Sequence, residues 1–158
     1  MRVAIIGSRS YPYLDEVREF VIALHQKYPD VEVVSGGADG VDMVAETACQ
    51  PFPVNEGNPI IPVVSFRPFQ IDEGHFGVEV WHLGIPIPYI ERLTEGAHGM
   101  WAEWKGAAWW RNKLIASYAD RGVVFWDGHS RGTSNTRDAF EAEGKPCHTY
   151  TPQQRFLA

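Results

Sequence analysis

Cysteine, long apolar runs and excess positive charge are all scarce in this 158-residue sequence, and each shortage excludes a class of protein. The two cysteines, Cys49 and Cys147, are far apart and make no secreted disulfide framework, so reduced thiols are expected. No stretch approaches the roughly 18 consecutive apolar residues that a membrane-spanning helix needs. The first apolar segment ends at Gly7, before it reaches the length of a signal peptide. We therefore expect a cytoplasmic protein with no membrane partner.

The charge balance is acidic, with 14 Lys and Arg residues against 20 Asp and Glu residues and a formal net charge of −6. Binding to a nucleic-acid backbone depends mainly on Lys and Arg contacts and on counterion release, so the sequence argues against a nucleic-acid partner. A small anionic ligand held by a few local groups stays compatible with this charge. The six histidines show neither the HExxH motif nor a Cys/His zinc spacing, so no metal site and no cofactor are expected.

Short apolar runs alternate with segments of helical periodicity along most of the chain, which predicts buried strands joined by crossover helices. The predicted strands are residues 3–7, 31–35, 60–66, 122–126 and 147–150, and the predicted helices are 14–28, 41–48, 107–119 and 134–143. This order predicts an α/β fold, a Rossmann-like three-layer α/β/α arrangement with a mainly parallel sheet.

The middle of the chain has a different composition, because residues 51–98 hold seven of the eleven prolines. Proline disrupts the hydrogen bonding of a central strand, so this region is predicted to contain one core strand and an irregular segment. The sequence thus predicts a single domain over residues 1–158 with an irregular Pro-rich insertion at about 67–98. We expect this insertion to act as a lid or a subunit contact.

Two Gly-rich segments follow the first two predicted strands. Residues 7–10 (GSRS) permit a tight turn and offer hydroxyl groups, backbone N–H groups and one guanidinium to phosphate oxygens. Residues 35–42 (SGGADGVD) hold three glycines within five positions, so backbone amides can converge on an anion. An ordinary turn is the alternative for the first segment, and a tight turn with Asp39 as the helix cap is the alternative for the second. The second segment matches neither the dinucleotide GxGxxG motif nor a P-loop.

Two further segments lie in the second half of the chain. Residues 111–113 (RNK) open a predicted helix and can reach a phosphate or a ribose hydroxyl, with a solvated basic turn as the alternative. Residues 127–134 (DGHSRGTS) follow a predicted strand and supply small residues and hydroxyl groups. In a doubly wound sheet all four segments lie at the carboxyl edge, where ligands bind at the switch in strand order. The expected ligand-binding residues are Gly7, Ser8, Arg9, Ser10, Gly36, Gly37, Ala38, Asp39, Gly40, Asp42, Arg111, Asn112, Asp127, Gly128, Ser130, Gly132, Thr133 and Ser134.

Taken together, the four segments resemble the SLOG superfamily, and within it the YspA-type branch, whose pattern runs GSR, GGAxGxD, W…RN and FxxGxSxGT. The matching sequences here are IIGSRS, VSGGADGVDMVAE and WRNKLIASYADRGVVFWDGHSRGTS. The resemblance covers residues 1–50 and about 101–148. It implies a Rossmann-like fold that binds a nucleotide or a nucleotide-derived ligand such as ADP-ribose, and a homo-oligomeric assembly.

Related families suggest two other functions. The cytokinin-activating phosphoribohydrolases use an Arg on the helix that matches Arg111 and a Glu three residues after the Thr of their GGxGT motif, where this sequence has Thr136. An N-glycosidic hydrolase acting on nucleoside monophosphates is therefore the alternative function, with Arg111 and Asp42 as candidate catalytic residues, and whether the chain is an enzyme stays open. The carboxylates that could replace the missing Glu are Asp39, Asp42, Glu46 and Asp138. The DNA-processing protein DprA has similar GSR, SGxAxGID and RN segments and binds single-stranded DNA, a function that the acidic charge of this chain argues against.

Four of the six tryptophans, Trp101, Trp104, Trp109 and Trp110, fall within ten positions that flank the RN motif. Two interpretations stay open for this cluster. The tryptophans either pack in a core or an interface, or form a wall on which a base stacks. In either case we expect them beside the ligand site.

Overall fold

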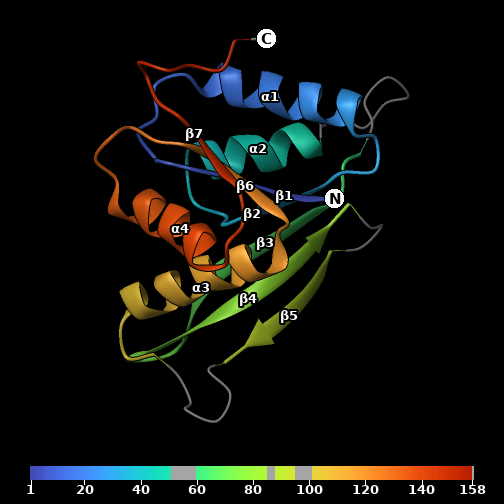
Figure 1. The fold of residues 1–158 in the computed structure, drawn as a ribbon. Coiled ribbons are helices and arrows are strands. Elements are labelled where there is room, and N and C mark those ends of the chain that lie inside the picture. The colour runs from blue at the N-terminus through green and yellow to red at the C-terminus, as the bar shows by residue number, and fades with distance from the viewer. Residues whose placement is uncertain (51–59, 85–87, 95–100, 158) are drawn as a thin grey trace.

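The computed structural model describes residues 1–50, 60–84, 88–94 and 101–157. Its described part contains seven strands and four helices, drawn in Figure 1. In chain order the elements are β1 (Arg2–Gly7), α1 (Leu14–Lys27), β2 (Glu32–Ser35), α2 (Val41–Cys49), β3 (Val63–Asp72), β4 (His75–Leu83), β5 (Tyr89–Leu93), α3 (Trp104–Tyr118), β6 (Arg121–Phe125), α4 (Arg131–Ala142) and β7 (Cys147–Tyr150). None of the described helices combines the length and the apolar character that crossing a bilayer requires.

The strands form one mostly parallel sheet in the order β5-β4-β3-β2-β1-β6-β7. The pairs β1–β2, β2–β3, β1–β6 and β6–β7 are parallel, whereas β3–β4 and β4–β5 are antiparallel. The predicted α/β, Rossmann-like fold is confirmed. From β1 the chain first adds β2 and β3 on one side and later adds β6 and β7 on the other side. The switch in strand order therefore lies between β1 and β6.

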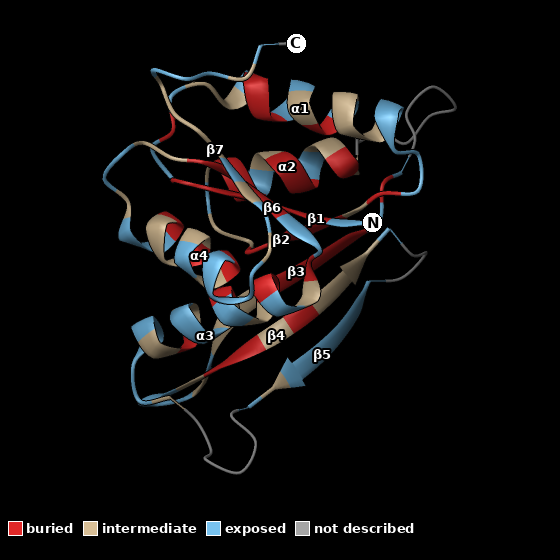
Figure 2. Cartoon of the chain, viewed as in Figure 1, coloured by how far each residue is buried: buried red, intermediate tan, exposed pale blue. Residues whose placement is uncertain are grey.

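Both faces of the sheet are covered by helices, and alternate side chains of β1 pack in the two cores, one on each face. Val3 and Ile5 point into a cluster with residues of α1 and α2, whereas Ala4 and Ile6 point into a second cluster with residues of α3 and α4. Side chains of successive strand residues point to opposite faces, so one continuous apolar strand can serve two cores. Figure 2 shows the buried central strands between the two helical layers.

The segment after Phe66 corrects one expectation, because it is largely regular. β3 continues to Asp72, β4 pairs with it antiparallel, and β5 pairs with β4. Val78 and Val80 alternate toward α3 and are buried, which gives β4 the two-residue periodicity of a strand. Pro68 is tolerated because the register of β3 with β2 ends at Ser65, so the proline lies where β3 is paired with β4 alone. Residues 85–87 and 95–98 of the expected insertion lie outside the described residues.

Helix α4 begins three residues earlier than the predicted start at residue 134. Ser130 is its N-cap, and its side chain accepts a hydrogen bond from the backbone N–H of Thr133. Residues 131–133, expected in a loop, therefore form the first turn of a helix. This places the amides of that turn at the carboxyl edge of the sheet.

Candidate functional site

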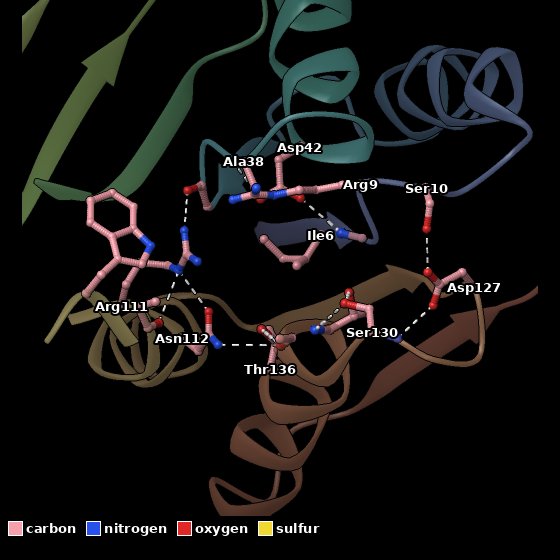
Figure 3. Close-up of a pocket in the computed structure, with 16 residues that line it drawn as sticks. Ile6, Arg9, Ser10, Ala38, Asp42, Arg111, Asn112, Asp127, Ser130 and Thr136 are labelled. Carbon is pink, nitrogen blue, oxygen red and sulfur yellow. Dashed lines mark hydrogen bonds between the residues drawn. The ribbon is translucent and has the colours of Figure 1, made fainter. Parts of the chain in front are cut away.

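A cavity of about 330 Å³ lies at the carboxyl edge of the sheet, beside the switch between β1 and β6. It is enclosed by the segments after β1, β2 and β6, by the first nine residues of α3 and by the start of α4. Arg111 and Asn112, expected at the start of a helix, lie in the middle of α3 instead, because this helix begins at Trp104. The expected ligand-binding residues that line it are Gly7, Arg9, Ser10, Gly36, Ala38, Asp42, Arg111, Asn112, Asp127, Ser130, Gly132 and Thr133. Trp104, expected beside the ligand site with the other tryptophans, also lines it, as do three residues outside the expected set, namely Ile6, Ala108 and Thr136. Figure 3 shows Arg9, Ala38 and Asp42 on one wall, facing Asn112, Ser130 and Thr136 on the other.

The other expected residues lie around this cavity. Gly37 and Asp39 line a smaller hollow of about 220 Å³ that adjoins it, and both hollows share Arg9, Trp104 and Arg111. Ser8 is buried, and its hydroxyl lies 3.3 Å from that of Thr133 and accepts a hydrogen bond from the Asp127 N–H. A Cβ atom at Gly40 would lie 2.7 Å from the backbone oxygen of Arg9. Gly128 and Ser134 are not among the residues that line either hollow.

The segments after β1 and β6 are joined by a network centred on Asp127. Its side chain accepts hydrogen bonds from the Ser10 hydroxyl at 2.6 Å and from the backbone N–H groups of His129 and Ser130 at 2.8 Å each. Its own backbone N–H donates to the Ser8 hydroxyl at 3.1 Å. Partial burial acts to raise the pKa of Asp127, but these hydrogen bonds outweigh it and lower the pKa to about 2. Asp127 is therefore an ionised acceptor at neutral pH, suited to a ligand hydroxyl.

Asp42 joins the segments after β1 and β2. The carboxylate is 2% exposed; Oδ1 accepts from the Gly7 N–H at 3.0 Å, and Oδ2 accepts from the Ala38 N–H at 3.3 Å. Burial raises the pKa of Asp42 to about 6, although the charge of Arg111 and both amide bonds oppose the shift. Two amides that the sequence reasoning offered to a phosphate are thus occupied by a carboxylate of the chain itself.

Arg111 crosses from α3 to the β2 side of the cavity. Its Nη1 donates to the carbonyl oxygen of Gly36, and its Nε donates to Oδ1 of Asn112 at 2.8 Å. Burial lowers the pKa of Arg111, and the charge of Asp42 acts in the opposite direction. Asn112 is buried and donates from Nδ2 to Oδ1 of Asn135 at 2.9 Å, which fixes α3 against α4. The RN motif therefore both faces the cavity and holds its walls together.

The smaller hollow has an arginine that the sequence reasoning placed only within the insertion. Arg67 of β3 forms an ion pair with the buried Glu46 of α2, and its Nε donates to the Ser65 hydroxyl at 2.9 Å. Ser65 also donates to Glu46 at 2.7 Å, so the three side chains form a closed network. The Arg67 guanidinium lies over the ring of Trp81, 5.0 Å from its centroid. These contacts fix Arg67 at the border of the hollow.

The carboxylates proposed as substitutes for the missing Glu are not equally placed. Of the four, Asp42 lines the larger cavity, Asp39 lines the smaller hollow, and Glu46 is paired with Arg67. Asp138 is exposed and lines a different hollow on α4. Thr136 itself is buried, and its hydroxyl donates to the carbonyl oxygen of Gly132 at 3.0 Å.

The tryptophan cluster divides into different environments. Trp104 lines both hollows and has an exposed fraction of 47%. Trp101 pairs through its backbone with Phe76 of β4, and its ring lies 5.7 Å from that of Trp110. Trp109 lies under the ammonium group of Lys105. One tryptophan therefore adjoins the cavity, while the others contact β4, α3 or solvent.

No protein-family model matches the chain, and no curated protein matches it. Among solved structures, the chain is similar to DNA processing protein A from Helicobacter pylori, whose structure was described for its single-stranded DNA binding mode. The TM-score is 0.56 at 22% sequence identity, and the match covers 94% of this chain and 64% of that protein. The chain thus spans less than two thirds of its structural neighbour. At this identity the similarity shows a shared fold and no more.

This similarity corrects the expectation that argued against nucleic acid as a partner. That expectation rested on the net charge of −6. A protein with this fold binds single-stranded DNA, so the acidic net charge does not exclude nucleic acid for a chain of this architecture.

Proposed function

We propose that the larger cavity binds a nucleotide, with the phosphate toward Arg9 and Arg111 and the sugar hydroxyls toward Asp127. The observation that carries this proposal is the convergence of two arginines, an ionised carboxylate and the first turn of α4 in one cavity of about 330 Å³. That volume is within the range of small-molecule sites, about 300–1,000 Å³. The amides of a helical first turn and guanidinium groups both favour phosphate oxygens.

The base has an aromatic partner within reach of the same cavity. Trp104 lines it from the first turn of α3 and is half exposed, so part of its side chain is accessible to a ligand. Stacking of a base on an aromatic ring contributes about 1–3 kcal/mol. The arrangement supports a ligand that carries a phosphate, a sugar and a base.

Titration calorimetry with nucleoside monophosphates and the matching nucleosides tests the proposal. Arg9 is exposed and lines the cavity, so Arg9→Ala should leave the fold intact and weaken monophosphate binding about 10-fold, the value of one charge-assisted hydrogen bond. Arg18→Ala on the outer face of α1 removes the same charge from an exposed position and should bind like the wild type. Equal binding of nucleosides and monophosphates, or equal affinities for the two variants, would contradict the proposal.

Chromatography of the same nucleotide mixtures separates binding from hydrolysis. In the proposed binding function the nucleotides are recovered intact, because the position of the family Glu is occupied by Thr136. Release of free base would instead favour the hydrolase alternative. Native mass spectrometry of the purified protein would then name any ligand that copurifies.

Single-stranded DNA binding is a second candidate function, and the similarity to DNA processing protein A favours it. A nucleotide unit of a DNA strand would offer the cavity the same phosphate, sugar and base. Fluorescence anisotropy with a labelled oligothymidylate tests this function, and specific binding should weaken steeply as salt is raised. If the oligonucleotide binds and competes with a mononucleotide, both use the cavity; if only the mononucleotide binds, the second candidate is excluded.

A further inference from the structure

Three arginines from three distant parts of the chain line the smaller hollow of about 220 Å³: Arg9 after β1, Arg67 on β3 and Arg111 on α3. The remaining charged residue that lines it is Asp39, which is exposed. We propose that this hollow is a second anion subsite, in which Arg67 contacts the outer phosphate of a nucleoside diphosphate or a related pyrophosphate ligand. The inference rests on the proposed function for the occupant of the larger cavity.

The position of Arg67 is fixed before any ligand binds. Its Nε and Nη2 are bonded to Ser65 and Glu46, which leaves Nη1 outside these bonds. Glu46 is 5% exposed and Ser65 is fully buried, so both partners lie beneath the hollow. A guanidinium held in this way loses little conformational freedom when it binds a phosphate.

The glycines of residues 36–40 provide the space for this arrangement. A Cβ atom at Gly37 would lie 2.5 Å from Cγ and Nε of Arg67, and a Cβ atom at Gly36 would lie 2.9 Å from Nη1 of Arg111. Gly37 also has a φ of +68°, which favours glycine. The loop after β2 is therefore shaped around the arginines that line the hollow.

The two hollows can accept one continuous ligand, because both are lined by Arg9 and Arg111. A phosphate between these two arginines lies at their border. A second phosphate joined to it extends either toward the α4 terminus or toward Arg67. Asp42 and Asp127 line the larger cavity and disfavour additional negative charge there, so the Arg67 side is favoured.

The test compares nucleoside diphosphates with the monophosphates of the same bases, and inorganic pyrophosphate with inorganic phosphate, by titration calorimetry. The wild type should bind diphosphates about 10-fold more tightly than monophosphates, as expected for one added charge-assisted contact. Replacing Arg67 alone would leave the buried Glu46 without its ion-pair partner. The informative variant is therefore the double change Arg67→Met with Glu46→Gln. It should lose the diphosphate preference and keep the monophosphate affinity.

The single change Glu46→Gln and the change Arg92→Met are the matched controls. Arg92 lies on β5, is paired with Glu79 and lines neither hollow, so its removal should preserve the preference. Circular dichroism confirms that each variant is folded. Equal wild-type affinity for diphosphates and monophosphates, or a preference that survives in the double variant, overturns the inference alone.

Failure of the proposed function gives a different pattern. If no nucleotide binds but pyrophosphate binds in an Arg67-dependent manner, the subsite stands and the nucleotide proposal fails. If neither nucleotides nor pyrophosphate bind to the wild type, both are overturned.

Discussion

Replacing Asp42 by asparagine tests how the segments after β1 and β2 are held together. The carboxylate accepts one hydrogen bond on each oxygen, from Gly7 and from Ala38. An asparagine can accept only one of these bonds and directs an NH₂ group at the other amide. The change therefore has two effects. It leaves one buried amide without a hydrogen-bond acceptor, which costs about 1–3 kcal/mol. It also removes a buried ionisable group, and with it that group's contribution to the pH dependence of unfolding.

The pH dependence of unfolding distinguishes the two effects. The pKa of Asp42 is raised from its ordinary value of 3.8 to about 6, so the folded state retains its proton at a higher pH than the unfolded state. Between about pH 4 and 6 the folded state binds more protons, and the free energy of unfolding therefore falls as the pH rises. The full shift corresponds to about 3 kcal/mol, of which about 2 kcal/mol falls between about pH 4.5 and 7.5.

Urea unfolding of the wild type and Asp42→Asn, followed by tryptophan fluorescence at several pH values, measures this contribution. Subtracting the two curves removes the titration of groups common to both proteins. The wild type should gain about 2 kcal/mol relative to the variant as the pH is lowered from about 7.5 to about 4.5. A difference that is constant with pH, or that falls toward acid, would refute the reasoning that burial controls the Asp42 pKa.

Three further substitutions test other parts of the structure. Gly37→Ala should lower the free energy of unfolding by about 1–3 kcal/mol in urea titrations, because the position has a φ of +68° and the new methyl group would contact Arg67. Ser10→Ala removes the hydrogen bond to Asp127, so carbon NMR titration should show the Asp127 pKa higher than about 2; an unchanged pKa would mean that the backbone amides alone set it. Phe140→Ala empties a fully buried site beside α3 and should cost about 3–5 kcal/mol in chemical unfolding, whereas a loss below about 1 kcal/mol would show that the core is rearranged around it.

Apolar runs predicted most of the sheet because buried parallel strands have a strong local signal. The run at residues 3–7 corresponds closely to β1, and the run at 122–126 corresponds to β6 within one residue. The prolines of the middle region predict an irregular segment, whereas the alternation in HFGVEVWHL is that of strand β4. Proline is incompatible with a strand only where the adjacent strand would accept a hydrogen bond from the N–H that proline lacks. Pro68 lies beyond the part of β3 that pairs with β2.

The candidate site was predictable where its residues follow strands, since a parallel sheet brings the carboxyl ends of its strands to one edge. Arg111 and Asn112 were found through the RN motif, and both line the cavity. Arg67 belongs to no such motif, because it lies inside β3, which continues past the end of its pairing with β2. Its role depends on the pairing with Glu46, a contact between residues 21 positions apart that no local pattern specifies.

The Gly-rich segment and the arginines are one structural feature, although they occur as separate motifs in the sequence. The sequence predicts that the glycines at 36 and 37 form a cradle for an anion, with backbone amides as the donors. The structure instead gives the Gly37 amide to Ser35 and the Ala38 amide to Asp42. Arg111, 75 positions away, bonds to the Gly36 carbonyl oxygen and occupies the space that a Cβ atom there would need. The absence of side chains at residues 36 and 37 therefore allows guanidinium groups to reach the edge of the sheet, and these groups, more than the loop amides, are available for the proposed phosphate.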